Sequence, residues 1–496
     1  MMNDYIDALG LVFQGYVLLA IAGGTLLGLI MGALPGLTAA MAIALLLPLT
    51  FGMPPVMGVG MLLGTLCGAI AGGSVSATLL NIPGTPSSVA TTLDAFPMAR
   101  SGQAGRALGI AIVASFLGGI FSAVVLSVLA PPIAEFALRF GAPEYFALSV
   151  FGLVIIASVS KNLAKGLIAG LLGLLLATVG SDPMVGSPRF TYGNMSLLTG
   201  INLLPALIGL FAVSQVLADV VDYFKTEKAD TSNTPIDKAS PRWMEVLKHW
   251  KVVLSSSIIG TIVGAIPGAG GSIASFLSYD QAKKMSKTPE KFGKGHSEGI
   301  IASESSNNSL VGGSLIPMLT LGVPGEAATA VLMGGLMIQG IRPGPTLFTE
   351  QGAIIYGIFI AFFVANIFMM LFQWFGIRLF IKILQIPRKL LMAMILVFCV
   401  IGVYAVDSNI FNVYLMLAFG VLGFFLNKYG FGTAPVILGL ILGPIAESNL
   451  RRALLVSGGD WTVFVTRPIS LSFLVVALLF LAFSLWQNAK HKTSFA

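Results

Sequence analysis

Charged residues are scarce in this chain. Only 10% of its 496 residues are Asp, Glu, Lys or Arg, whereas 56% are hydrophobic, and the mean hydropathy is +0.91. A soluble globular domain carries about 25% charged residues, so this chain has too few to cover the surface of a soluble protein of its size. The composition excludes the soluble, disordered, collagen-like and disulfide-framework classes. It predicts an integral membrane protein.

Cysteine and histidine are also rare. The two cysteines, Cys67 and Cys399, stand in apolar runs, and the three histidines lie far apart. No spacing of His, Cys and carboxylates resembles a zinc or haem site, so no cofactor is expected. The charge excess of 28 − 21 = +7 is typical of cationic cytoplasmic loops. The aromatic residues lie mostly in apolar spans, which argues against nucleic acid as a partner.

Apolar runs long enough to cross a bilayer recur along the chain. With the broken segments between them, they predict an all-α polytopic membrane protein with about 10–12 transmembrane segments. The clear runs are Tyr16–Leu34, Ala107–Leu129, Tyr145–Val159, Gly166–Val179, Leu203–Phe224, Ile354–Phe375, Leu390–Tyr404, Val413–Leu426 and Ile469–Trp486. The polar segment 225–251 divides the chain into a first membrane repeat, 1–224, and a second, 252–496.

Basic residues near the span ends predict the orientation. The lysine-rich segments 225–251 and 283–294 are both expected in the cytoplasm, so Val252–Asp280 between them must enter the membrane and return. Its middle, Gly264–Gly271, reads GAIPGAGG. Proline removes a helix hydrogen bond and glycine permits a reversal, so this segment is predicted to be a re-entrant hairpin. Irregular backbone at membrane depth is tolerated only inside protein or beside water.

An internal repeat links the two halves. Gly28–Gly36 aligns with Gly260–Gly268 at an offset of 267 − 35 = 232. Further on, GGS at 72–74 aligns with GGS at 312–314 (314 − 74 = 240), and the PG at 83–84 with the PG at 324–325 (324 − 83 = 241). Counting spans from the cytoplasmic linker makes the halves antiparallel, with a periplasmic N-terminus and a cytoplasmic C-terminus. One span more or fewer would make them parallel.

Inverted repeats with interrupted helices point to a secondary transporter whose site lies near the bilayer midplane. The interruptions carry glycine, proline, hydroxyl and amide groups but neither Lys nor Arg, so a helix N-terminus would have to hold an anionic substrate. A proline kink with capped ends that binds nothing is the alternative. The predicted substrate-binding residues are Pro35, Gly36, Thr38, Asn81, Pro83, Gly84, Thr85, Ser87, Ser88, Pro267, Gly268, Gly270, Ser272, Pro324 and Gly325.

Four polar residues are predicted to take part in ion coupling: Glu304, Asn307, Asn308 and Glu326. Acidic residues at membrane depth are costly and so are functional hypotheses, and the first three share one helix face. A sodium site is expected near Asn81 and Asn308, because sodium prefers oxygen ligands. An interhelical hydrogen-bonded contact is the alternative for the Glu304 cluster. Asp94 and Asp280 are expected at the membrane interface and not as ion ligands.

Taken together, these interruptions resemble the large membrane subunit of the tripartite tricarboxylate transporters. The resemblance covers nearly the whole chain and is weakest in 225–251 and the C-terminal span. Its motifs are GALPGLTAAMAIALLLPLTFGM (32–53), GGSVSATLLNIPGTPSSVATTLDAFPMARSGQAGRALG (72–109), GAIPGAGGSIASF (264–276) and ESSNNSLVGGSLIPMLTLGVPGEAATAVL (304–332). Glu326 stands where the family usually has a small hydroxyl residue, and a carboxylate there disfavours a highly charged anion.

The resemblance implies a secondary transporter of citrate-like carboxylates in the bacterial inner membrane. It implies two protein partners, a small membrane subunit and a periplasmic binding protein. It also implies substrate contact at the matching positions Pro35–Gly36, Asn81–Ser88, Pro267–Ser272 and Asn307–Asn308. We expect coupling to a sodium gradient, with protons as the second choice. Two other functions remain open: an intramembrane enzyme with Ser87 as nucleophile, for which no activating base is visible, and a passive anion channel.

Overall fold

The fold is built almost entirely of helices. A computed structural model describes residues 2–159, 162–223, 240–268, 270–383 and 388–493. Within these residues the strands are confined to one short antiparallel pair, β1 (Gly180–Ser181) with β2 (Pro188–Arg189). Seven helical stretches are long and apolar enough to cross a membrane, and six shorter apolar helices accompany them. The prediction of an all-α polytopic membrane protein is confirmed.

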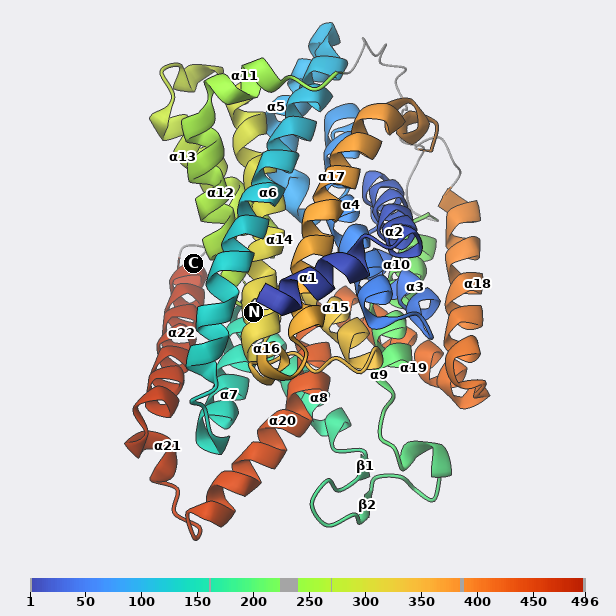
Figure 1. Cartoon of the computed structure of the whole chain (residues 1–496), viewed down its shortest axis with the longest axis vertical. Helices are drawn as coiled ribbons and strands as arrows, with labels where there is room; N and C mark the ends of the chain where they lie inside the picture. Colours follow the sequence, from blue (N-terminus) through green and yellow to red (C-terminus); the bar gives the residue numbers. More distant parts are fainter. Residues whose placement is uncertain (1, 160–161, 224–239, 269, 384–387, 494–496) are drawn as a thin grey trace. The chain divides into compact units, whose positions relative to one another are not determined.

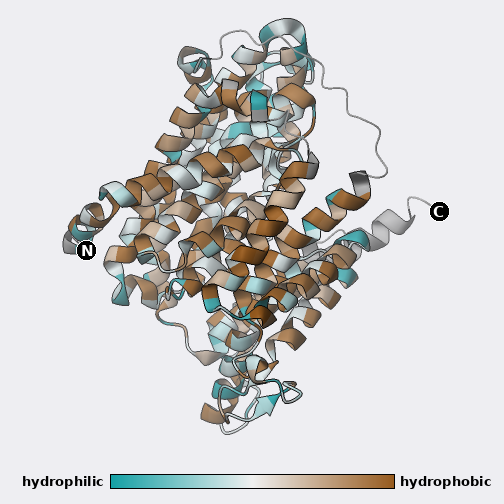
Figure 2. Cartoon of the chain, turned by 90° about the vertical axis from the view of Figure 1, so that its right-hand side faces the viewer, coloured by the Kyte–Doolittle hydropathy of each residue, from teal (hydrophilic) through white to brown (hydrophobic). Residues whose placement is uncertain are grey.

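The helix surfaces suit a lipid environment. Large apolar side chains such as Leu19, Leu171 and Phe375 are more than half exposed on long apolar helices. In Figure 2, hydrophobic residues line most of the helices, while hydrophilic residues gather mainly at helix ends and in the connecting loops. In water such exposure would be unfavourable, whereas lipid chains can cover it.

The chain forms two compact units. Unit one comprises residues 1–134 and 218–402, and unit two comprises residues 135–217 and 403–496. Each unit therefore contains chain from before and after the predicted linker 225–251. The units cut across the predicted division into repeats 1–224 and 252–496, as expected if each repeat contributes one part to each unit.

Unit one begins with helices that form a hairpin. Its first elements are α1 (Met2–Val12), α2 (Gly15–Ala33), α3 (Ala39–Leu46) and α4 (Pro55–Leu80). A Cβ on Gly28 or Gly32 of α2 would collide with the backbone carbonyl of Thr65 or Ala69 of α4, so the two helices touch backbone to backbone. Because these contacts advance in the same direction along both helices, α2 and α4 run parallel. The short α3 between them must therefore turn back, so the predicted span Tyr16–Leu34, which is one of the seven helices long enough to cross a membrane, forms the first arm of a hairpin.

The second half repeats this arrangement. Its elements are α12 (Trp250–Ala265), α13 (Gly270–Met285) and α14 (Ser297–Leu321). Gly260 and Gly264 of α12 contact the carbonyls of Ser306 and Leu310 of α14 just as Gly28 and Gly32 contact α4. α12 and α14 are thus parallel and α13 returns between them. The predicted reversal within Val252–Asp280 is confirmed.

The contacts also correct the alignment of the repeats by one residue. Gly72 packs on the carbonyl of Leu29, and Gly313 packs on the carbonyl of Thr261. The offsets are 261 − 29 = 232 and 313 − 72 = 241, so Gly72 corresponds to Gly313 and not, as the sequence alignment had it, to Gly312. The same offset of 241 then holds from α4 and α14 through the break that follows each of them.

The two halves of unit one are antiparallel. α5 (Val89–Met98) lies against α14, with Thr91 beside Ser303 and Asp94 beside Gly299, so the numbers run in opposite directions. The equivalent helix α15 (Ala327–Ile338) runs antiparallel to α4 in the same way. Figure 1 shows α5 at the end of unit one that holds α11 (Trp243–Lys248), and α16 (Thr346–Glu350), which follows α15, at the other end. The inverted orientation of the repeats is confirmed within this unit.

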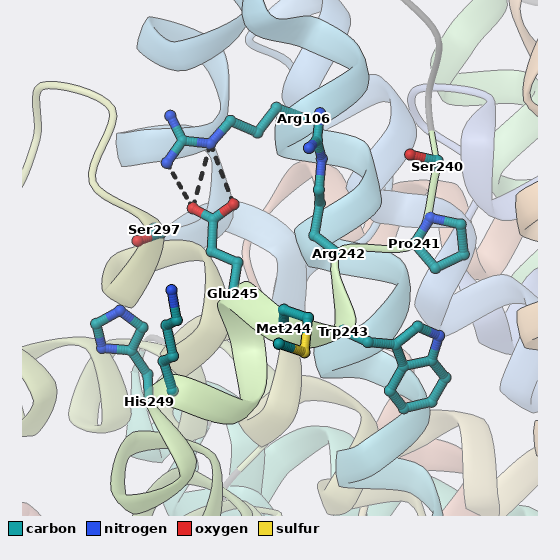
Figure 3. Close-up of a pocket in the computed structure, with 10 residues that line it drawn as sticks. Arg106, Ser240, Pro241, Arg242, Trp243, Met244, Glu245, His249 and Ser297 are labelled. Carbon is teal, nitrogen blue, oxygen red and sulfur yellow. Dashed lines mark hydrogen bonds and ion pairs between the residues drawn. The ribbon is translucent and has the colours of Figure 1, made fainter.

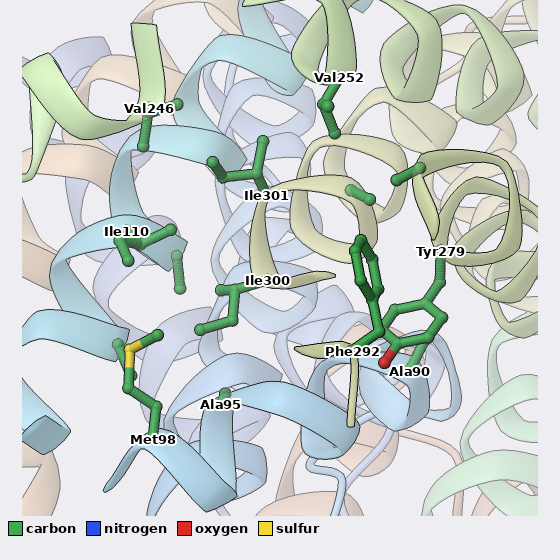
Figure 4. Packing of buried hydrophobic residues seen from close by; sticks show 14 of the residues in the cluster. Ala90, Ala95, Met98, Ile110, Val246, Val252, Tyr279, Phe292, Ile300 and Ile301 are labelled. Atoms are coloured by element: carbon green, nitrogen blue, oxygen red, sulfur yellow. The ribbon is translucent and has the colours of Figure 1, made fainter. Parts of the chain in front are cut away.

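Two longer helices complete unit one. α6 (Ala104–Ala137) runs along α14, and α17 (Gly352–Ile383) runs along α4. An apolar cluster from α5, α6 and α11–α14 joins the halves (Figure 4), with Ile300 and Ile301 of α14 fully buried in it. This cluster fixes the end of α14 that leads to the polar residues of the predicted site.

Unit two contains the remaining helices. They are α7 (Ala142–Val159), α8 (Leu163–Ala177), α9 (Leu203–Ile208), α19 (Ile410–Lys428), α20 (Ala434–Val456), α21 (Val463–Thr466) and α22 (Pro468–Thr493). Three helices continue from one unit into the other: α6, α10 (Ser214–Tyr223) and α18 (Arg388–Asp407).

The helix α20 was missing from the predicted spans because its second half carries charge. There Glu447 and Arg451 hold the β1–β2 loop: Asp182 Oδ2 lies 2.8 Å from Arg451 Nη1, and Glu447 Oε1 lies 2.7 Å from Arg189 Nη1. Together with backbone N–H donors from Met184 and Val185, Arg451 lowers the pKa of Asp182 to about 2.

Candidate functional site

Each predicted interruption is a true break between helices. Thr38 is the N-cap of α3, where its Oγ1 accepts the N–H of Met41 at 3.2 Å, and Gly36 just before it has a φ of +93°. In the other half, Gly268 has a φ of +82° and its N–H donates to the carbonyl of Gly325 at 2.6 Å. Pro35 and Pro267 thus belong to the turns of the two hairpins, as predicted.

The second break of each half is a capping box. Thr85 caps the short 3₁₀ turn Pro86–Ser88 that leads into α5, and its N–H donates to Ser88 Oγ at 3.2 Å. Glu326 caps α15 in the same way, and its N–H donates to Thr329 Oγ1 at 3.0 Å. The pairs are equivalent, since 326 − 85 = 241 and 329 − 88 = 241. Glu326 is therefore a carboxylate in the first turn of a helix, where it compensates the positive end of the dipole.

Asn81 has a backbone role that the sequence did not reveal. It is the C-cap of α4 with a left-handed φ of 56°, and its equivalent in α14 is Gly322, with a φ of 71° (322 − 81 = 241). Asparagine is among the few residues with a side chain that adopt this conformation at low cost. Its geometry alone therefore explains an Asn at this position, and its predicted part in a sodium site remains a prediction.

The carboxylate of Glu304 lies at the centre of the polar cluster. Glu304 is fully buried, and its oxygens accept hydrogen bonds from Thr91 Oγ1 at 2.5 Å and Ser115 Oγ at 2.8 Å. Asn308 donates to the Glu304 carbonyl at 3.1 Å. Thr91 and Ser115 come from the first half of the chain, so this carboxylate joins the two inverted halves. Sequence reasoning missed both; Thr91 shares a helix face with Ser87 four residues earlier, which was the available signal.

The register of α5 against α14 extends this cluster. Asp94 faces Gly299, and Thr91 faces Ser303 and Glu304. Moving one further turn along both helices brings Ser87 and Ser88 level with Asn307 and Asn308. The 3₁₀ turn containing the two serines does contact α14. Ser87, Ser88, Thr91, Glu304, Asn307 and Asn308 are called the α5–α14 site below.

Asn307 is the exceptional member of the α5–α14 site. It is fully buried beside the Glu304 carboxylate, yet neither its amide oxygen nor its amide nitrogen makes a hydrogen bond of normal distance and angle within the described part of the chain. The neighbouring hydroxyl of Ser306 is buried and unpartnered as well. An unpaired buried polar group costs about 1–3 kcal/mol. Such groups are usually satisfied by a ligand, an ion or water.

The second hairpin forms another wall of the site. Ser275 Oγ of α13 donates to the Ser87 carbonyl at 2.7 Å, and a Cβ on Gly271 would collide with Ser87 Cβ. The structure therefore brings the predicted first-half residues Thr85, Ser87 and Ser88 close to the hairpin that carries the predicted Gly270 and Ser272. Gly84 packs instead on the carbonyl of Gly32, so its role is close backbone approach.

The ion-coupling residues do not form a single group. Glu304, Asn307 and Asn308 lie together, but Glu326 follows the far end of α14. After Leu321 the chain turns back, and Gly325 packs on Ser314 of α14, about 15 Å along the helix from Glu304 and about 9 Å from Asn308. Pro324, Gly325 and Glu326 thus lie beside the middle of α14, further along the same helix than the α5–α14 site.

The residues of the α5–α14 site have apolar counterparts in the inverted repeat. With the offset of 241, the counterparts of Glu304, Asn307 and Asn308 on α4 are Leu63, Leu66 and Cys67. The counterpart of Thr91 on α15 is Leu332. All four of these counterparts are apolar and buried. The scaffold is duplicated, but the polar site is single.

The acidic residues expected at the interface have different surroundings. Asp94 is fully buried within the protein, and its Oδ1 accepts the N–H groups of Gly293, Gly295 and His296, in the loop after the lysine-rich stretch, at 2.7–2.9 Å. Tyr279 donates to its Oδ2 at 2.8 Å. These four donors hold the carboxylate in place, and whether it binds an ion stays a prediction. Asp280 is exposed and pairs with Lys284, as expected at an interface.

Comparison with known proteins agrees with this architecture. Residues 18–438 match the tripartite tricarboxylate transporter TctA family. One relative is the Agrobacterium vitis "Uncharacterized 52.8 kDa protein in TAR-I ttuC' 3'region", which is 40% identical over 473 residues, covering 95% of this chain and 93% of the relative. The "Uncharacterized protein in TAR-II ttuC' 3'region" of the same organism is 40% identical over 233 residues, 47% of this chain and 96% of the relative. No solved structure matches this chain.

Proposed function

The chain belongs to the tripartite tricarboxylate transporter TctA family, and on this basis we propose that it is the permease subunit of a secondary active transporter that imports carboxylates. The observation that carries the proposal is the α5–α14 site, with a buried, unpartnered Asn307 beside the N-terminus of α5 and the carboxylate of Glu304. Family membership supports transport, and the buried amide of Asn307 supports the α5–α14 site as the proposed binding site.

The substrate carboxylate would bind at the N-terminus of α5. Thr85 and Ser88 cap this helix with neutral hydroxyl groups, so its partial positive charge is not cancelled by the cap. At the equivalent α15 the carboxylate of Glu326 already occupies that position. One substrate carboxylate therefore has one helix end with a neutral cap available to it, once a cation offsets the nearby Glu304 carboxylate, and Asn307 would donate the next hydrogen bond. Glu326 favours substrates with fewer negative charges over citrate.

The coupling cation would bind beside Glu304. A carboxylate, an amide oxygen and hydroxyl groups are ligands that suit sodium, and a carboxylate can take up a proton instead. Sodium is favoured and protons are the second choice. Glu304 belongs to the second half and accepts hydrogen bonds from Thr91 and Ser115 of the first. A cation bound there would therefore change the contact between the two inverted halves, which move against each other during alternating access.

Two partners complete the proposed transporter. A periplasmic binding protein would deliver the substrate, and a small membrane subunit would assemble with this chain in the bacterial inner membrane. The N-terminus is proposed to be periplasmic and the C-terminus cytoplasmic. Reporter fusions at both ends test this orientation.

The transport proposal is tested by uptake into proteoliposomes that contain the permease, its small subunit and its binding protein. Radiolabelled citrate and succinate serve as tricarboxylate and dicarboxylate probes, under an imposed sodium or proton gradient. We expect gradient-dependent, saturable uptake, with succinate preferred. Uptake that ignores both gradients would refute coupling, and unsaturable flux would indicate the passive channel.

Variants locate the site. Asn307→Ala should reduce uptake by at least tenfold without lowering membrane abundance, because the native amide has no structural partner to lose. Asn81→Gly keeps the left-handed backbone and removes only the amide, so it isolates any ligand role of Asn81 from strain. Unchanged uptake in Asn307→Ala would show that the substrate binds elsewhere.

The intramembrane enzyme receives no support from the geometry. The Ser87 hydroxyl lies 3.1 Å from Thr85 Oγ1, and the contacts described for it include no histidine, lysine or carboxylate base. Stoichiometric labelling of the purified protein by a fluorophosphonate would revive this function.

A further inference from the structure

A second polar pocket lies at the start of α14, seven residues or about 10 Å along the helix from Glu304. It has a volume of about 730 Å³ and opens where the beginning of α6 meets α11 and the first residue of α14. Figure 3 shows Arg106, Arg242, Trp243, Glu245 and His249 around it. All its lining residues belong to unit one. It is called the Arg242 pocket below.

Some of the charges in the Arg242 pocket are already paired. Arg106 forks onto Glu245, with Nη2 at 2.5 Å and Nε at 3.2 Å from the carboxylate. His249 Nδ1 lies 2.8 Å from Glu298 Oε1. These contacts hold Arg106 and His249 in place, and the second oxygen of Glu298, Oε2, is buried without a partner among the described residues.

Two cations remain without a counter-charge. Neither Arg242 nor Lys248 has a carboxylate partner among the residues that the structure describes, and Nε of Arg242 is buried with no hydrogen-bond partner. The Arg242 backbone N–H donates to the Gly109 carbonyl at 3.1 Å, which fixes the start of this side chain against α6. An oriented guanidinium with free N–H groups is the protein group best matched to a phosphate.

The surroundings of the pocket match the surface of a membrane. Trp243 packs edge to face on Phe116 of the apolar α6, with ring centroids 5.8 Å apart. Trp250, half-exposed, begins the apolar helix α12 directly after the pocket. Tryptophan is enriched at the boundary between lipid and water. Basic pockets between transmembrane helices near the boundary between lipid and water suit the headgroups of anionic lipids.

From these observations we propose that the Arg242 pocket binds a phosphate group, supplied by the headgroup of an anionic phospholipid. Arg242 and Lys248 hold the phosphate, while Trp243 lies at the level of the glycerol and ester groups. The bound headgroup ties α6 to α11 and so joins the first half of unit one to the second. This site is independent of the proposed substrate site.

The test measures thermal unfolding of the purified full-length chain. The chain has two cysteines, both buried, so a thiol-reactive dye reports unfolding without further labelling. Phosphatidylglycerol added to the detergent should raise Tm by about 2–5 °C relative to phosphatidylcholine. This rise should shrink as the salt concentration increases, because salt screens exposed charges.

Two double variants separate the Arg242 pocket from general charge attraction. Arg242→Gln with Lys248→Gln should abolish the rise, whereas Lys283→Gln with Lys284→Gln, which removes the same charge from exposed positions of α13, should keep it. An equal rise in both variants, or none in the wild type, would overturn the proposal. Inorganic phosphate alone distinguishes the source: if it reproduces the rise and the pocket variant loses it, the site binds free phosphate and the lipid assignment is wrong.

Discussion

The carboxylate of Asp94 offers the sharpest test of how the structure positions its site. It accepts three backbone N–H groups from the loop that begins α14 and the hydroxyl of Tyr279. Each hydrogen bond to a charged group contributes about 1.5–3 kcal/mol. Asp94→Ala removes all four acceptor contacts, but Gly293 is exposed and water can replace its bond. We expect a net destabilisation of about 3–5 kcal/mol, less than the sum because such effects are not additive.

Two further variants provide comparisons for the destabilisation expected of Asp94→Ala. Asp94→Asn keeps an oxygen for the three N–H groups and places an NH₂ beside Tyr279, whose hydroxyl oxygen can accept it, so we expect about 1–2 kcal/mol. Asp280→Asn is the matched control, because Asp280 is exposed and pairs only with Lys284 one turn away. Such pairs contribute about 0.3–0.5 kcal/mol.

The assay is thermal unfolding in detergent, followed with the same thiol dye, together with membrane abundance. The order of Tm should be Asp280→Asn above Asp94→Asn above Asp94→Ala, and the Asn variant should still transport. If Asp94→Ala melts with the wild type, the loop that begins α14 is held by other contacts and the reasoning fails. If Asp94→Asn is stable but loses coupling to the ion gradient, Asp94 is an ion ligand after all.

Three shorter predictions follow from the described contacts. Gly32→Ala should lower Tm and membrane abundance, by about 1–3 kcal/mol of overpacking against the Ala69 carbonyl, whereas Gly23→Ala, with open space around its Cβ, should not. Glu304→Gln keeps the shape of the side chain and removes its charge, so uptake should lose its dependence on the sodium or proton gradient while abundance is unchanged; persisting gradient dependence would exclude Glu304 from coupling. Asp182 has a folded pKa of about 2, below its ordinary 3.8, so it stabilises the fold above pH 4 and this stabilisation is lost as the pH falls towards 2. The Tm of the wild type should therefore exceed that of Asp182→Asn at pH 6 and converge with it near pH 2, and parallel curves would contradict the ion network around this residue.

Much of the fold could be predicted because helix breaks are local. The proline–glycine pairs at 35–36, 83–84, 267–268 and 324–325 favour helix breaks through their own backbone geometry, and the four breaks are found at these positions. Hydroxyl residues next to the breaks are capping residues by their own chemistry, as Thr38 and Thr85 are. The helix α20 was missed for an equally local reason, since its charged second half lowers the mean hydropathy, and its long-range ion pairs could not be foreseen.

The surroundings of the site residues could be predicted from the sequence only in part. Glu304, Asn307 and Asn308 were grouped correctly because they share a helix face. Glu326 was grouped with them by residue type, and the residue before it packs on Ser314, about 9 Å along α14 from Asn308. The sequence offered no sign of the partners of Asp94, which belong to a loop about 200 residues later.

The amino-acid sequence alone determined the class of the protein, the duplication of its halves and the positions of its breaks, because hydropathy, glycine and proline act over a few residues. Only the tertiary structure decided that both halves contain hairpins and that the polar site is single. It also decided that Glu304 is bonded from the other half. Each of these depends on which helices touch and in what register, and that is set by packing between residues far apart in the chain.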